Sequence, residues 1–266
     1  MYPYDLIPGV SLYVIFICVG IIACFITFSK LSDKRKISAK VHNLALICGI
    51  LGIAVGLGFA VIFQALYNIA SLGRFEISES TGSTFYGGLI GGAAIFLLVY
   101  FVYGGVKIKD RAQLKEFFPL LSCIAPAIAI AHGFGRLGCL TAGCCHGCQT
   151  DSWIGIMMHG NMGYAKYVPT QLFEAIFLFL LCALLIIRAV EGKKYNFSFY
   201  TVGYGIWRFA IEYVRADYRG STFVSFLTPS QLVAIGFIAA GIALVFVERW
   251  AEKKALTSEP EGCENE

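Results

Sequence analysis

HGFGRLGCLTAGCCHGC, residues 132–148, is a glycine-rich stretch with an arginine, two histidines and several thiols, set between long apolar runs. Glycine inside a helix costs about 1 kcal/mol relative to alanine, and it lets the backbone approach a ligand closely. Arg136 stands between Gly135 and Gly138 at the end of an apolar run. We interpret this stretch as a site held at a membrane boundary, around which the rest of the chain is organised.

The composition identifies the class of protein. The chain is 58% hydrophobic and 14% charged, with a mean hydropathy of +0.71, whereas a soluble domain is about 25% charged. We therefore predict an all-α integral membrane protein. The net charge of +4 does not indicate nucleic-acid binding, because the basic residues fall in short loops. The cysteines do not resemble a secreted disulfide framework, and the first apolar run lacks the features of a cleaved signal.

Seven apolar runs approach the length of about 20 residues that a membrane-spanning helix requires. They cover about 10–29, 44–69, 85–103, 117–132, 170–187, 197–214 and 231–247. The fourth run contains Pro119 and Pro126, so we expect an unwound or re-entrant far end. We predict one polytopic membrane domain over residues 1–250, with an extracytoplasmic loop at about 134–168. Residues 251–266 are predicted to be a polar, disordered cytoplasmic tail.

The lysines and arginines predict the orientation, because basic residues concentrate in cytoplasmic loops. The segments after the first, third, fifth and seventh runs hold fifteen of them, and the segments on the other side hold four. The N-terminus is therefore expected outside and the C-terminus in the cytoplasm. Residues 132–148 then face the extracytoplasmic side.

Charged residues stand inside the sixth apolar run. Arg208, Glu212 and Arg215 are spaced to share one face of a helix. A charge at the centre of a bilayer costs at least ~2.5 kcal/mol, so such residues usually pair or form a site. Arg208 and Glu212 could simply neutralise each other. However, two arginines face one glutamate, and Arg136 adds positive charge, which favours binding of an anion such as a phosphate.

Small residues open the third apolar run. Gly91 and Gly92 are typical of close helix packing. Tyr86, Gly87 and Gly88 suit either packing or a functional role.

Two further polar residues lie at the start of the fifth apolar run. Gln171 and Glu174 are either cavity residues or interfacial hydrogen-bond partners. We favour a cavity, because Glu174 lies a full turn into the apolar run.

The thiols of the organising stretch form the pattern CxxxxCCHxC. Its members are Cys139, Cys144, Cys145, His146 and Cys148. The spacing is not a standard zinc motif, so no metal is predicted outright. Even so, the group has the donors for a soft metal or for thiol exchange. Other interpretations are a structural disulfide between Cys144 and Cys145, or small residues that fill a tight loop.

Five motifs together resemble the bacterial prolipoprotein diacylglyceryl transferases in order and spacing. They are FYGGL (85–89), GRLG (135–138), PTQLFEA (169–175), GYGIWRFAIEYVR (203–215) and LTPSQLVAIGFIAAGI (227–242). The resemblance implies seven spans with the N-terminus outside, in the bacterial plasma (inner) membrane. It also implies transfer of the diacylglyceryl group of phosphatidylglycerol to the cysteine thiol of a lipoprotein precursor. The expected partners are those two substrates and membrane lipid, with no nucleic acid and no cofactor.

The resemblance also implies site residues. The expected catalytic residues are Arg136, Arg208, Tyr86 and Glu212. The expected substrate-binding residues are Arg215, Gly87, Gly88, Gly135, Gly138, Cys139, Cys144, Gly147, Gln171 and Glu174. This chain departs from the family pattern at three of these positions. Tyr86 replaces a histidine, Cys139 an asparagine and Cys144 a glutamate.

The implied reaction is attack of the acceptor thiolate on a glycerol carbon, with glycerol phosphate leaving. Arg136 and Arg208 would hold the phosphate, while Tyr86 would orient the acceptor. His132 or His146 is a candidate general base. Two alternatives are thiol redox or soft-metal chemistry at the cysteine cluster, and lipid transfer to a different acceptor.

Overall fold

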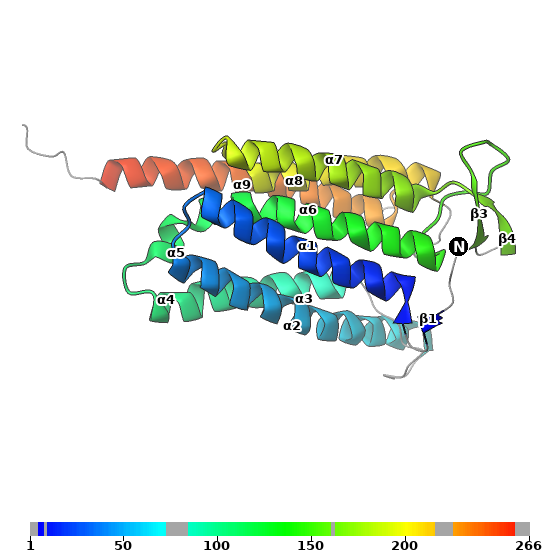
Figure 1. Ribbon diagram of the computed structural model, residues 1–266, viewed down its shortest axis with the longest axis horizontal. Coiled ribbons are helices and arrows are strands. Elements are labelled where there is room, and N and C mark those ends of the chain that lie inside the picture. The colour runs from blue at the N-terminus through cyan, green and yellow to red at the C-terminus, as the bar shows by residue number, and fades with distance from the viewer. Residues whose placement is uncertain (1–4, 8–9, 73–84, 161–162, 216–225, 259–266) are drawn as a thin grey trace, which may run out of the picture. The chain divides into compact units, whose positions relative to one another are not determined.

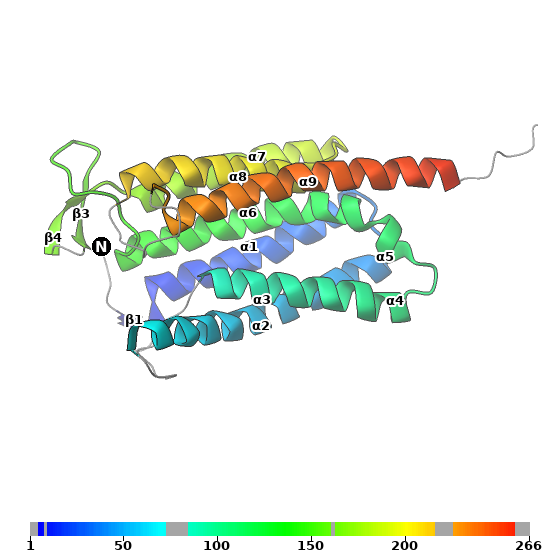
Figure 2. The same ribbon diagram turned by 180° about the vertical axis from the view of Figure 1, so that it is seen from behind.

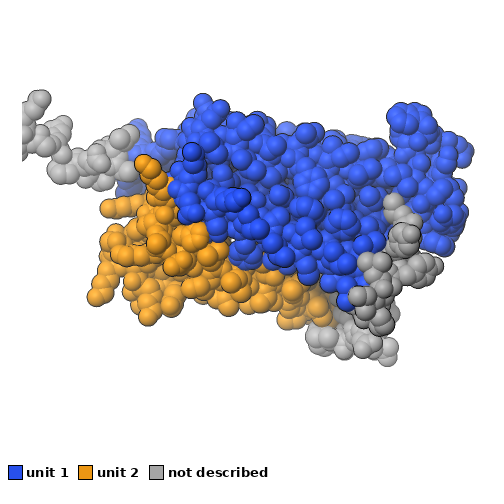
Figure 3. All heavy atoms as spheres, viewed as in Figure 1, with its two compact units in different colours: residues 1–35, 118–266 blue, residues 36–117 orange. Residues whose placement is uncertain are grey.

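The computed structural model describes residues 5–7, 10–72, 85–160, 163–215 and 226–258, which are mostly helical. The chain divides into two compact units, which Figure 3 colours separately. Unit 1 comprises residues 1–35 and 118–266, and unit 2 comprises residues 36–117. Unit 1 therefore contains the organising stretch.

Unit 1 is built from long helices that lie alongside one another (Figures 1 and 2). They are α1 (Leu12–Lys34), α6 (Phe117–Ala142), α7 (Thr170–Val190), α8 (Asn196–Ile211) and α9 (Pro229–Ser258), and a 3₁₀ turn, η2 (Glu212–Val214), extends α8. A buried cluster joins α6, α7 and α8 through Ala125, Ala129, Leu178, Leu185 and Tyr204, among others. This packing fixes the three helices that carry the charged residues.

Unit 2 is a helical pair with a short, irregular continuation. Its elements are α2 (Ala39–Leu72), α3 (Phe85–Leu98), a π-helical turn η1 (Val99–Tyr103), α4 (Gly104–Lys107) and α5 (Ala112–Lys115). A Cβ added to Gly92 would lie 2.9 Å from the Gly52 carbonyl oxygen, and one added to Gly56 would lie 2.9 Å from the Gly88 carbonyl oxygen. The glycines thus permit backbone contact between α2 and α3, which confirms the packing role expected of Gly92.

Of the described helices, six are long and apolar enough to cross a membrane, and the chain is a multi-pass membrane protein. They are α1, α2, the α3–α4 segment, α6, α7 and α9. The sixth predicted run is also helical, but the α-helical part of α8 is only 16 residues long. Arg208 lies in the last turn of α8, and Glu212 and Arg215 follow the helix, so charged residues stand where the apolar run ends.

The helices show the inside-out polarity expected in lipid. On α7, Leu180 is 66% exposed while Glu174 is 0% exposed. A lipid environment solvates apolar side chains, so polar groups turn inward and find partners in the protein.

The prediction that the far end of the fourth run is unwound or re-entrant is wrong. α6 continues as a helix to Ala142, well past His132. A Cβ on Gly138 would lie 3.1 Å from Tyr13 Cδ2, and one on Gly133 would lie 2.7 Å from the Phe179 ring. Close approach of α1 and α7 therefore offsets the poor helix propensity of these glycines.

The segment predicted as an extracytoplasmic loop begins after Ala142 and contains a β-hairpin that the sequence analysis missed. Strand β3 (Ile156–Gly160) pairs antiparallel with β4 (Gly163–Tyr167), with Ile156 opposite Tyr167. A second small ribbon near the N-terminus pairs β1 (Asp5–Ile7) with β2 (Val10–Ser11). Figure 1 shows the β3–β4 hairpin at the end of unit 1 where α6 ends and α7 begins. The all-α prediction is therefore correct for the long elements and incomplete for these short strands.

Candidate active site

Glu174 is the centre of a buried network in unit 1. One carboxylate oxygen, Oε2, lies 3.1 Å from Arg136 Nε and 4.0 Å from Arg215 Nη1. The other, Oε1, accepts a 2.9 Å hydrogen bond from the Tyr204 hydroxyl and lies 4.0 Å from His132 Nε2. Side chains from α6, α7 and α8 and from the residue that follows η2 therefore meet at one carboxylate.

A second carboxylate holds the α8 arginine. Arg208 Nη2 lies 2.8 Å from Glu212 Oε2 and donates a 2.8 Å hydrogen bond to the Ser230 hydroxyl. Thr228 donates to the other Glu212 oxygen at 3.0 Å. Arg215 Nε lies 4.0 Å from Glu212 Oε2, which links this pair to the Glu174 network. The predicted pairing of Arg208 with Glu212 is therefore present, within a larger group.

The network carries an unbalanced positive charge. Among the described residues, three guanidinium groups face two carboxylates, so the arginines exceed the carboxylates by one positive charge when histidine is neutral. The side chains of Arg208 and Arg215 are 6% and 2% exposed, and that of Arg136 is 13% exposed. Buried charges are expensive unless they are paired. The described part of the network therefore favours an anionic ligand.

Arg208 also presents a donor that the described residues leave unused. Its buried Nη1 has no hydrogen-bond partner among them. An unsatisfied buried donor costs about 1–3 kcal/mol or more when charged. A ligand oxygen at this point would recover that free energy.

A tight turn follows α6 and reaches the start of α7. Gly143 and Cys145 have positive φ angles of 73° and 64°, and the backbone reverses there. The Gln171 side-chain amide donates to the Cys144 carbonyl oxygen at 2.5 Å, and the Thr170 hydroxyl donates to that of Cys145 at 2.9 Å. Gln171 therefore supports the turn.

Gly147 closes the turn onto two other segments. Its N–H donates to the Val168 carbonyl oxygen at 2.8 Å, and it pairs across from Arg215 in an isolated β-bridge. An added Cβ would lie 2.8 Å from the Val214 oxygen and 2.9 Å from the Val168 Cβ. Only glycine fits without a shift, and the contact fixes the backbone from which the Arg215 side chain extends.

Known proteins of similar sequence extend over nearly the whole chain. The family model described as prolipoprotein diacylglyceryl transferase matches residues 6–247. A protein of Clostridium tetani named phosphatidylglycerol–prolipoprotein diacylglyceryl transferase is 34% identical, over 89% of this chain and 92% of its own. The chain belongs to the prolipoprotein diacylglyceryl transferase family. Similarly named proteins of Clostridium perfringens and Finegoldia magna are 32% and 31% identical, over 91% and 87% of this chain and 92% and 88% of their own.

The structure brings together most of the polar residues that the family resemblance singled out. Arg136, Glu174, Arg208, Glu212 and Arg215 form the network described above.

The predicted glycines of this family member have packing contacts. Gly138 faces α1. Gly135 is the exception, because among the described residues an added Cβ would meet only Ile17 Cδ1, at 3.8 Å. Gly87 and Gly88 lie in unit 2, where Gly87 packs against Phe63 and Gly88 against the Gly56 oxygen. The Tyr86 side chain lies outside the described residues.

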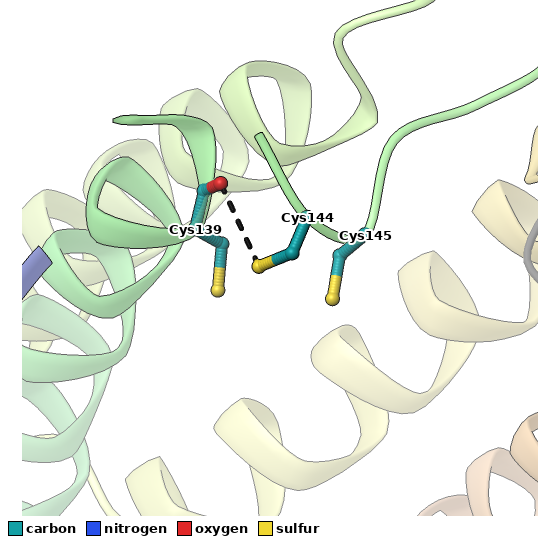
Figure 4. Close-up of side chains that lie close together, drawn as sticks. All are labelled: Cys139, Cys144 and Cys145. Atoms are coloured by element: carbon teal, nitrogen blue, oxygen red, sulfur yellow. Dashed lines mark hydrogen bonds between the residues drawn. The ribbon is translucent and has the colours of Figure 1, made fainter. Parts of the chain in front are cut away.

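Three of the five thiol-cluster candidates come together. The sulfur atoms of Cys139, Cys144 and Cys145 all lie within 4.8 Å of one another, and Figure 4 shows the Cys144 side chain between the other two, pointing toward Cys139. His146 is 3% exposed, and its Nδ1 lies 2.9 Å from the Gly147 oxygen. Cys148 is exposed, and neither it nor His146 belongs to the group of three.

Hydrogen bonds within the group shift the pKa values of Cys144 and Cys145 in opposite directions. Hydrogen bonds with the Cys139 and Cys144 thiols, helped by the Arg215 guanidinium, hold the pKa of Cys145 below its usual range although burial opposes this. Hydrogen bonds with Cys139 and Cys145 raise the pKa of Cys144. Cys145 is therefore the thiol of the two that carries negative charge more readily.

Sequence reasoning missed the neutral partners of the network. Tyr204, Thr228 and Ser230 each bond a charged member of the site. Tyr204 lies four residues before Arg208, and the other two belong to the motif LTPSQL at residues 227–232. For Thr228 and Ser230, a polar group near the start of an apolar run was the signal available, as it was for Gln171. Tyr204 lies in the middle of its run, one turn before Arg208.

Proposed function

We propose that this chain transfers the diacylglyceryl group of phosphatidylglycerol to the cysteine thiol of a lipoprotein precursor. The observation that carries the proposal is the surplus positive charge of the buried network, in a chain of this family. A phosphodiester head group is an anion that lipid can deliver to such a site. Arginine suits it, because the planar guanidinium donates two parallel hydrogen bonds to phosphate oxygens.

Arg136 and Arg208 bind the phosphate in this mechanism. The unused Nη1 of Arg208 is a donor for a phosphate oxygen. Glu174 and Glu212 orient the guanidinium groups through the ion pairs at 3.1 Å and 2.8 Å. Donors fixed before the reaction stabilise charge that develops in the transition state, at about 3 kcal/mol per donor in other enzymes.

The chemical step exchanges one bond for another at a glycerol carbon. The acceptor cysteine loses its proton to a base, because the thiolate is the nucleophile. Its sulfur then attacks the diacylglyceryl carbon that bears the phosphate. The C–S bond forms, the C–O bond breaks, and glycerol phosphate leaves with the electron pair. His132, whose Nε2 lies 4.0 Å from Glu174 Oε1, is the candidate base.

The membrane arrangement follows the charge pattern. We assign seven spans, with α8 and η2 as the sixth, an outside N-terminus and a cytoplasmic C-terminus, in the bacterial inner membrane. Residues 1–250 make one polytopic membrane domain, and residues 251–266 are its cytoplasmic tail. The site then opens on the extracytoplasmic side, where signal-bearing precursors emerge.

Expression of the chain in a bacterium depleted of its own transferase tests the proposal. We expect mass spectrometry to find the diacylglyceryl mass on lipoprotein N-terminal peptides. The mass should be lost with Arg136→Ala and with Arg208→Ala, because each removes a phosphate donor. We expect at least a hundredfold loss of product.

Arg249→Ala is the matched control, since Arg249 is an exposed arginine on α9 outside the network. It should leave product formation unchanged. Absence of the mass shift from a well-inserted wild-type chain would contradict the proposal, as would full activity of either site variant.

A further inference from the structure

The resemblance implied substrate binding by Cys139 and Cys144, but the transfer mechanism proposed above gives no role to the thiols of Cys139, Cys144 and Cys145. Cys139 lies on the last turns of α6, and Cys144 and Cys145 lie on the turn that follows it. Cys144 is exposed, while Cys139 and Cys145 are half-buried. The group is therefore within reach of small solutes at the end of unit 1.

The separation of the sulfur atoms suits a metal ion. Zinc binds thiolates at ~2.3 Å, so two sulfurs in a tetrahedral site are ~3.8 Å apart. The three sulfurs already lie within 4.8 Å of one another, so no pair must close by more than about 1 Å. None of the three forms a disulfide in the structure.

The backbone of the turn holds the thiols in this arrangement. Cys145 adopts a left-handed conformation, with φ at 64°, that a residue with a Cβ avoids unless its surroundings hold it there. The hydrogen bonds from Thr170 and Gln171 supply that constraint. Cys144 and Cys145 are therefore held beside Cys139, and the Cys144 side chain points toward it (Figure 4).

We propose that Cys139, Cys144 and Cys145 bind one Zn²⁺ ion at the edge of the active site. Thiolates prefer soft or borderline cations such as zinc to calcium or magnesium. Each thiol that coordinates the ion releases its proton to water. Among the described residues the group holds three donors, so the fourth position belongs to water or another small ligand.

The electrostatics complement this assignment. Three thiolates and one Zn²⁺ ion have a net charge of −1, and the Arg215 guanidinium lies against the Cys145 sulfur. The adjacent network carries one surplus positive charge. The metal centre therefore satisfies the charge that would otherwise attract the phosphate, so bound zinc inhibits lipid transfer. This regulatory consequence rests on the proposed function, while the binding of zinc does not.

Zinc binding is measured directly on the purified full-length chain. The protein is stripped with a chelator under reducing conditions, incubated with Zn²⁺, desalted and analysed for its elements. We expect about one zinc per chain. The Cys139→Ser and Cys145→Ser variants should each bind zinc at least tenfold more weakly in competition with a chromogenic chelator.

Cys148→Ser is the matched control, because it removes an exposed thiol of the same segment that lies outside the group. It should retain both the zinc and its affinity. Less than about 0.2 zinc per wild-type chain overturns the proposal. So does equal weakening in the control variant. A cluster isolated without reductant as a disulfide, two mass units lighter and unable to take up zinc, also overturns it.

A second measurement isolates the regulatory consequence. Product formation by the wild-type chain should fall at least tenfold with one equivalent of Zn²⁺ and recover with chelator, and Cys148→Ser should behave in the same way. If zinc binds and an active chain is not inhibited, the regulatory part is wrong. If zinc binds to a chain that makes no product even without metal, the proposed function fails and the metal site stands.

Discussion

Glu174 is the residue on which the proposed site depends most, because one carboxylate lies near three basic groups and accepts the Tyr204 hydroxyl. Glu174→Gln keeps the shape and removes the charge, which leaves Arg136 without its carboxylate. Removing one partner of a buried ion pair lowers the free energy of unfolding by about 3–5 kcal/mol, because the other charge stays buried without compensation. We expect a lower melting temperature in detergent and at least a hundredfold loss of product.

A buried carboxylate elsewhere in unit 1 provides the control for this change. Glu248 on α9 is 5% exposed and lies outside the network, so Glu248→Gln should keep product formation near that of the wild type. Wild-type activity and stability in Glu174→Gln would show that the carboxylate does not organise the arginines.

At the level of elements, the turn after α6 depends on the backbone approach at Gly147. Alanine there would place a Cβ 2.8 Å from the Val214 oxygen, and overpacking of this kind costs about 1–3 kcal/mol. We expect Gly147→Ala to lower the melting temperature and, because Arg215 shifts with its β-bridge partner, to reduce product formation at least tenfold.

Gly135→Ala is the informative comparison in the same segment. Its added Cβ has only Ile17 Cδ1 nearby, at 3.8 Å, and alanine favours a helix by about 1 kcal/mol over glycine. Its stability should be equal or higher. Loss of product from a fully stable Gly135→Ala chain would mean that this glycine serves close approach of the lipid. Equal destabilisation of both variants would contradict the packing argument.

At the scale of the whole molecule, the proposed orientation is tested with native thiols. Two variants are made, each retaining only Cys148 or only Cys263. A membrane-impermeant maleimide should label Cys148 in intact cells and Cys263 only after the membrane is opened, because the former follows α6 and the latter lies in the C-terminal tail. The reverse pattern would contradict the proposed orientation. Labelling of both thiols in intact cells would place them on the same side of the membrane, which contradicts the odd number of spans proposed between them.

The sequence by itself determined the membrane class and the placement of the long helices, because apolar length and loop charge are local properties of the chain. Helical spacing also paired Arg208 with Glu212, and the 2.8 Å ion pair agrees with it. Arg215 follows η2 in an extended conformation, so the prediction that it shares their helical face is wrong, although it lies 4.0 Å from Glu212. The length of α6 was underestimated, since glycine and proline lower helix propensity locally while contacts of Gly133 and Gly138 with neighbouring helices restore it.

Only the tertiary structure decided which groups of distant segments meet. Glu174 joins Arg136, which lies 38 positions earlier, and Tyr204, which lies 30 positions later. Ser230 reaches back to Arg208 in the same way. Of the cysteine-rich pattern, it separated three clustered sulfurs from His146 and Cys148. Spacing along a chain predicts which residues share a helical face. The packing of the helices and the reversal at Cys145 decide which of those faces meet, and they therefore bring together the charged network and the three thiols.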